Sequence, residues 1–403
     1  MSDAIAERLR QVAGRVEHDE GGIPRALPND GAEAAAVLGL AHAEGWRARV
    51  EGAGTWCPTD APADLALATT NLTRIKQLAP GDLVATVEAG LAMTDLDRAL
   101  APHGVEVALD PPGAPERTLG SVLATATAGP RRQAVGPTRD HVLGLAVATG
   151  DGRAVRAGGT VVKNVAGYDL AKLAVGSFGA FGVITEASLR LRTRPARRLS
   201  MLVTGGFDPL FDAGRSLAGL AIDFGAIELA SPGLTGGPDW TLAIQLAGTD
   251  ELVASMAERV RAATPALSWL EARDDAARQL ADALAQGALD GPVTLRLGAL
   301  ADAIPELLHQ LGEVVPEGRL SAGLGRGGVR WTGEAQARAI GELRQRAAAL
   351  EVPITLERAP WPVRRAAGHF GAYREGVGRL TAKLRDVFDP SRVLLVPLEA
   401  GDG

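Results

Sequence analysis

Apolar and polar positions along the chain predict helices and strands that alternate in two blocks. In the first block, residues 32–44 and 94–101 have helical spacing, whereas residues 47–50, 65–69, 83–88 and 182–192 have the pattern of strands. Residues 142–148 and 154–157 are typical of two strands, and Gly150-Asp151-Gly152 between them is a hairpin signal. Residues 169–175 are expected to form a further helix.

A second block begins after Pro195 and contains almost no motif. Helices are expected over residues 251–263, 304–313, 334–350 and 373–387, and strands over 240–245, 293–297, 328–331 and 353–357. This alternation predicts an α+β, ferredoxin-like sandwich with helices on one sheet face. We therefore expect one domain at 1–195, with subdomains of about 1–100 and 101–195, a second domain at 196–385, and a C-terminal segment at 386–403.

Composition and charge exclude several classes of protein. The net charge of −6 provides no basic surface for nucleic acid, and the one dense basic run, 190–198, is either a solvated domain junction or an anion site. The single cysteine, Cys57, excludes a disulfide framework, a cysteine-ligated iron–sulfur cluster and a cysteine-rich zinc site. The six histidines form no metal-binding pattern, so no metal is expected. The chain has neither a long apolar stretch nor a signal peptide, which predicts a cytoplasmic protein without direct membrane insertion.

A glycine-rich loop, Gly52-Ala53-Gly54-Thr55, directly follows the strand expected at 47–50. Without Cβ atoms a backbone can approach phosphate oxygens closely and offer them several N–H donors at once. Many strand-to-loop turns contain two glycines, however, so this loop alone does not decide between a phosphate site and an ordinary turn. The chain has no G-x-G-x-x-G motif opening a helix and no G-K-[ST], which excludes the Rossmann and P-loop patterns.

The stretch 110–136 is rich in Gly, Pro, Ala and Thr and has no sustained periodicity. We expect a long loop here, and long loops inside a compact domain are usually functional. A series of short motifs runs through this stretch and beyond it. They are Asp110-Pro111-Pro112-Gly113, Thr118-Leu119-Gly120-Ser121, Ala128-Gly129-Pro130-Arg131-Arg132, Gly136, Asp140, the segment 161–170, Gly176-Ser177-Phe178-Gly179 and Gly182-Val183-Ile184-Thr185-Glu186.

In this order the motifs resemble the PCMH-type FAD-binding domain of the vanillyl-alcohol oxidase superfamily, over roughly residues 20–195. The Gly-Pro-Arg-Arg motif at 129–132 and the segment 163–170 resemble more narrowly the FAD-binding subunits of bacterial glycolate oxidases. The resemblance implies a two-part FAD-binding domain, an α+β cap or substrate domain, and a C-terminal segment that returns towards the flavin domain. It also implies that the cofactor is FAD.

The resemblance carries cofactor contacts onto particular positions. The loop at 52–56 would hold the pyrophosphate, the segments at 111–112 and 118–125 would flank the ring system and phosphates, and Gly129 would lie close to the isoalloxazine. Val183 and Ile184 would meet adenosine through their backbone. The implied cofactor-binding residues are Gly52, Ala53, Gly54, Thr55, Trp56, Pro111, Pro112, Thr118, Gly120, Ser121, Ala124, Thr125, Gly129, Gly136, Val183 and Ile184.

Attachment of the flavin is expected to be non-covalent. Where relatives carry a covalently bound histidine on this loop, this chain has Thr55, and Cys57 is better explained as a small packing residue. The chain also departs from the family in three places. Glu51 and Ala53 replace an arginine and a glycine of the first loop, Ser121 replaces a second glycine, and only Pro397 remains of an Asn-Pro-Gly turn near the C-terminus.

Oxidation of a 2-hydroxy acid by a flavin needs a base for the hydroxyl proton and a cation for the carboxylate. Arg131 and Arg132 are candidates for that cation, but they are equally suited to FAD phosphate or to an acidic partner surface. Lys163 is a third candidate catalytic residue, and Tyr168 and Asp169 are equally open. His309 and His369 stand alone and are expected on the surface or in packing.

Three functions are compatible with this sequence. The chain is the FAD-binding subunit of a glycolate (2-hydroxy acid) dehydrogenase complex that passes electrons to an iron–sulfur partner, or a self-sufficient FAD-dependent D-2-hydroxy acid dehydrogenase, or a non-catalytic assembly subunit. The first implies a homologous catalytic flavin subunit and an iron–sulfur subunit as partners, and peripheral contact with the inner membrane only through them. Catalytic relatives often carry metal-binding histidines and an acidic residue in the substrate domain. This chain lacks that set, which favours the first and third functions over the second.

Overall fold

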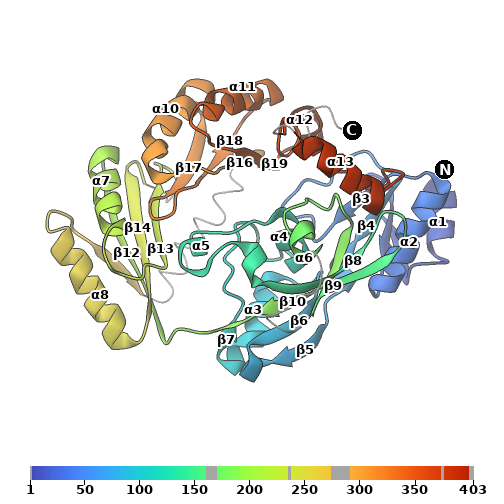
Figure 1. Ribbon diagram of the computed structural model, residues 1–403, viewed down its shortest axis with the longest axis horizontal. Coiled ribbons are helices and arrows are strands. Elements are labelled where there is room, and N and C mark those ends of the chain that lie inside the picture. The colour runs from blue at the N-terminus through green and yellow to red at the C-terminus, as the bar shows by residue number, and fades with distance from the viewer. Residues whose placement is uncertain (1, 160–169, 235–236, 274–290, 374–375, 399–403) are drawn as a thin grey trace.

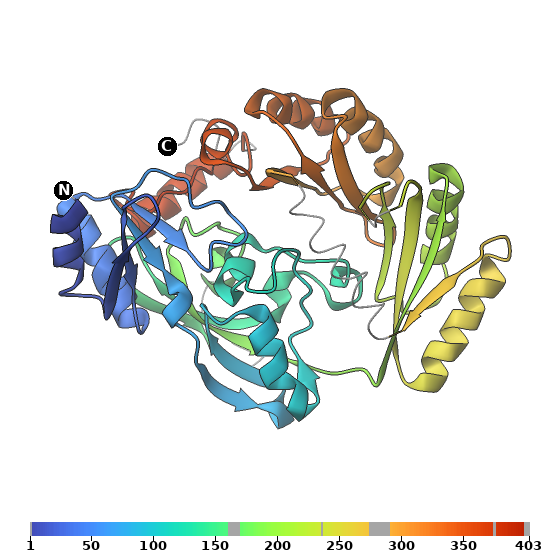
Figure 2. The same cartoon turned by 180° about the vertical axis from the view of Figure 1, so that it is seen from behind.

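The computed structural model describes residues 2–159, 170–234, 237–273, 291–373 and 376–398. Within these residues the strands form sheets of four, five, two and eight strands. The eight-stranded sheet lies on one side of the molecule, and the sheets of four and five strands lie on the other (Figures 1 and 2).

The four-stranded sheet contains the N-terminal strands in the order β1-β2-β4-β3. Here β2 (Pro24–Leu27), β4 (Leu65–Ala68) and β3 (Ala48–Glu51) are parallel, and β1 (Arg15–His18) pairs antiparallel with β2. The helices α1 (Ser2–Leu9) and α2 (Gly31–Glu44) pack on it through small aliphatic side chains. The C-terminal segment joins this sheet, because the Leu395 N–H donates to the Ala48 carbonyl at 3.1 Å.

The five-stranded sheet is antiparallel, in the order β5-β6-β10-β8-β9. Its strands are β5 (Ile75–Ala79), β6 (Val84–Glu88), β10 (Val183–Arg190), β8 (Val142–Ala148) and β9 (Ala154–Gly158). A shared apolar core joins it to α3 (Met93–Leu100), α4 (Leu119–Thr125) and α6 (Leu170–Ala174). Nearby, β7 (Val105–Glu106) pairs with β11 (Arg192–Thr193).

The eight-stranded sheet, called the cap sheet below, has the order β15-β12-β14-β13-β17-β18-β16-β19 and is antiparallel throughout. Helices cover its outer face, and its inner face looks towards the first two sheets (Figures 1 and 2). The strands are β12 (Arg197–Gly205), β13 (Ala226–Ala230), β14 (Trp240–Gly248), β15 (Leu270–Arg273), β16 (Val293–Leu297), β17 (Gly318–Gly323), β18 (Val329–Gly333) and β19 (Ile354–Arg358), and the helices are α7 (Phe207–Ala218), α8 (Asp250–Ala263), α10 (Ile304–Val314) and α11 (Ala337–Ala348).

Three short or terminal helices connect the parts. The four- and five-stranded sheets with their helices are called the flavin side below, after the cofactor expected there. The short helix α5 (Arg132–Val135) reaches from the flavin side to the cap sheet, where the Gln133 side-chain oxygen accepts a hydrogen bond from the Ile227 N–H at 3.2 Å. After the last cap strand, α12 (Trp361–Ala367) and α13 (Val377–Phe388) lead the chain back to the first two sheets (Figure 1). The end of α13 meets the β8–β9 hairpin, because the Gly150 N–H donates to the Phe388 carbonyl at 2.8 Å.

Most elements expected from periodicity are present, but the expected loop at 110–136 is wrong in part. It contains α4 and α5. Thr118 begins α4 by accepting a hydrogen bond from the Ser121 N–H, and Leu119, Val122 and Leu123 bury one face of the helix. The strands β5, β13 and β17 were not expected, because their short apolar runs lie beside glycine or proline. Residues 160–169 lie outside the described residues.

The core of the cap sheet depends on Trp331 of β18, which is 1% exposed. Replacing it by alanine removes a large buried side chain and leaves a cavity. We expect Trp331→Ala to lower the free energy of unfolding by about 3–5 kcal/mol, measured by urea denaturation followed by circular dichroism. Leu252→Ala is the control, because Leu252 is 51% exposed and its loss should cost less than about 0.5 kcal/mol. Equal effects of the two substitutions would contradict this description of the core.

Candidate functional site

The glycine loop 52–55 leaves the end of β3 and forms one wall of a narrow cleft. Gly54 has a φ of +72°, a backbone conformation that side chains rarely adopt. A Cβ atom on Gly52 would lie 2.3 Å from Thr118 Oγ1, so only glycine allows the loop to approach the start of α4 this closely. The two motifs are separated by more than sixty residues in the sequence, and the backbone of Gly52 contacts the side chain of Thr118.

The start of β10 forms another part of the cleft wall. Gly182 has a φ of +128°, and a Cβ atom there would lie 2.6 Å from the Ala148 carbonyl oxygen. Val183 and Ile184 follow, and both are buried. Twelve of the sixteen residues implied as cofactor contacts line this cleft, namely Gly52, Ala53, Gly54, Thr55, Trp56, Thr118, Gly120, Ser121, Ala124, Thr125, Val183 and Ile184.

The other four implied contacts lie elsewhere. Pro111 lines a separate, larger cavity, and the Pro112 carbonyl accepts a hydrogen bond from Arg117 at 2.5 Å. Gly129 packs against Asp110, since a Cβ atom there would lie 2.0 Å from the Asp110 carbonyl oxygen. Gly136 ends α5 with a φ of +88°. The structure thus brings the loop, the start of α4 and the start of β10 together, and leaves the 111–112 and 129–136 motifs beside them.

The cleft wall contains donors that suit an anionic, acceptor-rich ligand. Trp56 Nε1 and Arg364 Nε are buried and have no hydrogen-bond partner among the described residues. The cleft measures about 140 Å³, whereas pockets for ligands of this kind usually measure ~300–1,000 Å³. FAD would therefore occupy more space than this cleft alone provides. The unpaired donors of Trp56 and Arg364, and the close approach of the glycine loop to α4, fit the pyrophosphate of FAD.

Arg117 is the main residue of this site that sequence reasoning missed. Its guanidinium is buried, lies 4.0 Å above the Trp56 ring, and donates to Thr125 Oγ1 at 2.8 Å and to Thr127 Oγ1 at 2.9 Å. Burial lowers the pKa of Arg117 to about 9. Arg117 therefore ties the 112–127 segment to the residue that follows the glycine loop. Its only sequence signal is a charged residue directly before the Thr118 cap.

The cleft ends against the last part of the chain. The His369 ring stacks on Phe178 at 3.9 Å, and its Nδ1 lies 2.7 Å from the Leu356 carbonyl oxygen. Burial lowers the pKa of His369 to about 3, so this histidine is neutral, and the prediction of a packing histidine is confirmed. His309 is on the surface beside Glu313, as expected. Pro397, the remnant of the family turn, also lines the cleft.

Cys57 is in the same cleft but has the surroundings of a packing residue. Its Sγ lies 3.6 Å from the Glu357 carbonyl oxygen, and burial raises the pKa of the thiol. A thiol with a raised pKa is a poor nucleophile. The environment therefore favours non-covalent binding of a flavin.

The cap sheet turns a buried ion cluster towards the flavin side. Glu357 of β19 is 0% exposed and lies 3.0 Å from Arg330 Nε and 3.1 Å from Arg296 Nε. Burial alone would raise the pKa of Glu357, but the two arginines hold it below its ordinary value. Arg330 also donates to the Ala128 carbonyl at 2.9 Å, and Arg296 to the Ala126 carbonyl at 3.4 Å. The cluster thereby fixes the 126–128 segment against the cap sheet.

Asp110 lies beside this segment. Its carboxylate accepts a hydrogen bond from the Arg131 N–H at 2.9 Å. Burial raises the pKa of Asp110 to about 6, although the charges of Arg131 and Arg330 oppose the shift. On β13, burial raises the pKa of Glu228 to about 8, with Arg330 opposing and Asp110 adding to the shift. Two carboxyl groups of unequal acidity therefore share one interface with Arg330, a pattern typical of acid–base sites.

The three residues that the sequence suggested for catalysis lie in different places. The Arg131 side chain pairs with Glu106 and lines the larger cavity. Arg132 begins α5 and is exposed. Lys163 lies outside the described residues, as do Tyr168 and Asp169. No group of three metal-ligating side chains occurs among the residues that the structure describes.

Comparisons with known proteins agree with this geometry. Residues 25–158 match the family model described as the FAD binding domain. The chain is 44% identical over 123 residues to glycolate oxidase subunit GlcE of Escherichia coli, covering 30% of this chain and 35% of that protein. It is 36% identical over 149 residues to glycolate oxidase subunit GlcD of Bacillus subtilis, covering 37% and 31%, and 34% identical over 167 residues to D-lactate dehydrogenase of Archaeoglobus fulgidus, covering 41% and 37%.

The matched stretches thus span only about a third of these relatives. Among solved structures, alkyldihydroxyacetonephosphate synthase is similar over 92% of this chain and 76% of its own, with a TM-score of 0.67 at 15% sequence identity. At that identity the similarity concerns the fold alone, and it confirms the predicted α+β architecture. No helix in the described part of the chain is long and apolar enough to span a bilayer.

The close approach at Gly52 provides a direct test of the cleft. We expect Gly52→Ala to weaken FAD binding by about tenfold or more, because the new methyl group would push the loop away from Thr118. The measurement is the dissociation constant of FAD, by fluorescence titration of the flavin-stripped protein. Gly81→Ala is the matched control, since no atom lies within 4 Å of a Cβ atom at that exposed position. Unchanged FAD affinity in Gly52→Ala would place the cofactor elsewhere.

Proposed function

We propose that this chain, whose residues 25–158 match the model of the FAD binding domain, is the FAD-bearing subunit of a complex that oxidises glycolate or another 2-hydroxy acid. The names of the relatives support this reaction class. The observation that carries the proposal is the meeting of Asp110, Arg131 and Arg330 next to Gly129. A base and two cations at one interface are what such an acid needs.

The cleft residues would hold the cofactor. The backbone of the loop at 52–55 and the Trp56 and Arg364 donors would contact the pyrophosphate, and Val183 and Ile184 would meet the adenosine end. When bound, FAD supplies an acceptor for the hydride that leaves the substrate Cα with both electrons of its C–H bond. The protein residues have to hold the acid and manage its charge.

Asp110 is suited to accept the proton of the substrate hydroxyl group. As the substrate C–O bond becomes a carbonyl, the hydroxyl O–H bond breaks and the proton goes to the Asp110 carboxylate. A pKa of about 6 leaves this group ionised near neutrality and able to accept a proton. Glu228, whose pKa is raised to about 8, stays protonated next to it, so the two carboxyl groups do not repel each other.

Arg131 and Arg330 are suited to bind the carboxylate of the substrate. A guanidinium offers five N–H donors in a planar fork that matches a carboxylate. Among the described residues, the side-chain contacts of Arg131 engage one nitrogen and those of Arg330 engage two. Both residues therefore retain donors for a substrate anion.

Electrons would leave the reduced flavin through partners. With a single cysteine the chain cannot carry an iron–sulfur cluster of its own. We propose a homologous flavin subunit and an iron–sulfur subunit as partners, which would also place the complex at the membrane surface. The subunit names of two relatives support assembly into a complex.

A second candidate is a self-sufficient dehydrogenase. The convergence of a base and a carboxylate clamp within one chain favours it. Anaerobic addition of glycolate or D-lactate to the purified chain with bound FAD separates the two functions. Slow or absent bleaching alone, and rapid bleaching once the co-purifying partners are added, supports the subunit function. Rapid bleaching of the isolated chain supports the second candidate, and no bleaching in either preparation contradicts both.

The acid–base role of Asp110 leads to a pH dependence. The carboxylate must be ionised to accept the proton, so the rate of flavin reduction should be low below pH about 6 and rise to a plateau above it. We expect Asp110→Asn to lower this rate by about 100-fold or more and to abolish the dependence, measured by stopped-flow absorbance. Asp82→Asn, at an exposed position, is the control. A wild-type rate that does not change between pH 5 and 7 would refute the role.

A further inference from the structure

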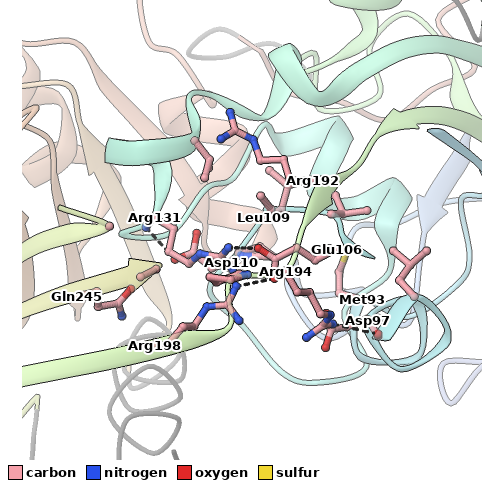
Figure 3. A pocket seen from close by; sticks show the side chains of 18 of the residues that line it. Met93, Asp97, Glu106, Leu109, Asp110, Arg131, Arg192, Arg194, Arg198 and Gln245 are labelled. Carbon is pink, nitrogen blue, oxygen red and sulfur yellow. Dashed lines mark hydrogen bonds and ion pairs between the residues drawn. The ribbon is translucent and has the colours of Figure 1, made fainter. Parts of the chain in front are cut away.

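A large cavity opens between the flavin side and the cap sheet, next to Asp110 and Arg131. It measures about 1100 Å³ and lies between α3, β7 and the 107–117 segment on one side and β12 and β14 on the other. Figure 3 shows Asp110 and Arg131 together in this cavity, with Gln245 facing them from the cap sheet. The cavity therefore continues from the proposed reaction centre.

The part of the cavity around Asp110 and Arg131 is polar and crossed by ion pairs. Arg131 and Arg198 both pair with Glu106, from the flavin side and from β12 respectively (Figure 3). Glu106 is buried, and although burial alone would raise its pKa, the two arginines hold it below its ordinary value. This ion cluster joins the two sides of the cavity at the point where Asp110 lies.

The remaining wall is largely apolar and comes from both sides. Its apolar side chains are Met93 of α3, Val107 and Leu109 just after β7, and Pro111 on one side, and Pro195 and Ala247 on the side of the cap sheet. Arg192 and Arg194 of the basic run line the cavity as well. Arg194 pairs with Asp97, and Arg192 adds positive charge that favours an anion. The cavity thus combines the positive charge of Arg192, an apolar wall, and Asp110 as a base.

Glycolate has no side chain and leaves this apolar wall without a contact. Pockets that hold a drug-sized ligand measure ~300–1,000 Å³, and this cavity is at least as large. A 2-hydroxy acid with an extended alkyl or aromatic side chain would place its carboxylate and hydroxyl at Asp110 and Arg131, and its side chain along the wall.

We propose that this cavity binds the substrate's side chain, and that the chain acts on 2-hydroxy acids with a long apolar side chain in preference to glycolate. The proposal rests on the proposed function, because it places the reacting end of that acid at Asp110. Each methylene group transferred to an apolar wall strengthens binding by about fourfold. Several such groups should yield a large and measurable preference.

The test compares 2-hydroxyoctanoate with glycolate on the protein with bound FAD. Their dissociation constants are measured by isothermal titration calorimetry without oxygen, and flavin bleaching is recorded in the same samples and again with the co-purifying partners. We expect 2-hydroxyoctanoate to bind about 30-fold more tightly or better. Ala247→Trp places a large ring in the cavity from an exposed position on β14. It should reduce the preference for 2-hydroxyoctanoate over glycolate by about tenfold or more and leave glycolate binding unchanged.

Ala254→Trp is the matched control, because Ala254 is exposed on α8 and does not line the cavity. It should bind both acids as the unchanged protein does. Equal affinity for the two acids, or an Ala247→Trp protein that keeps the full preference, overturns the side-chain site. Bleaching by glycolate together with either of those results would leave the proposed function intact. Failure of both acids to bleach the flavin, even with partners present, contradicts the proposed function itself.

Discussion

The arrangement of the site depends on one buried ion cluster. Glu357 holds Arg296 and Arg330 on the inner face of the cap sheet, and the same two arginines hold the carbonyls of residues 126 and 128. Because a buried carboxylate without its cations would be costly, the three side chains fix one another. The flavin side and the cap sheet therefore meet in a defined way, and Asp110 and Gly129 are held at their junction.

Backbone geometry is the second constraint, and it was readable from the sequence. The loop at 52–55, the segment at 118–125 and the start of β10 were assigned to one cofactor from their order alone, and the structure places them around one cleft. Glycine is informative here because it marks places where a Cβ atom would collide, as at Gly52 and Gly182. The α+β architecture was predictable for a related reason, since long periodic segments determine helices and strands more reliably than short ones do.

The charged part of the site was not predictable in the same way. Arg296, Arg330 and Glu357 lie on three strands of the cap sheet, and their meeting depends on the strand order β18-β16-β19, which no local pattern specifies. Arg117 was missed because its partners, Trp56 and Thr127, become neighbours only after folding. Asp110 was noted only as part of a proline-glycine motif, since its raised pKa arises from burial at a junction. The helix α4 was hidden by the small residues around it, although Leu119, Val122 and Leu123 have helical spacing.

Backbone loops would thus hold FAD, and charged residues at the junction with the cap sheet would bind the substrate and take its proton. The most direct test of these roles is the rate of flavin reduction by a 2-hydroxy acid carrying deuterium at Cα, measured without oxygen on the protein with its co-purifying partners. If Asp110 takes the proton while the hydride goes to the flavin, the flavin is reduced, the deuterated acid reacts several times more slowly, and both rates fall when Asp110 is replaced. Flavin reduction with no isotope effect and no dependence on Asp110 would contradict these roles.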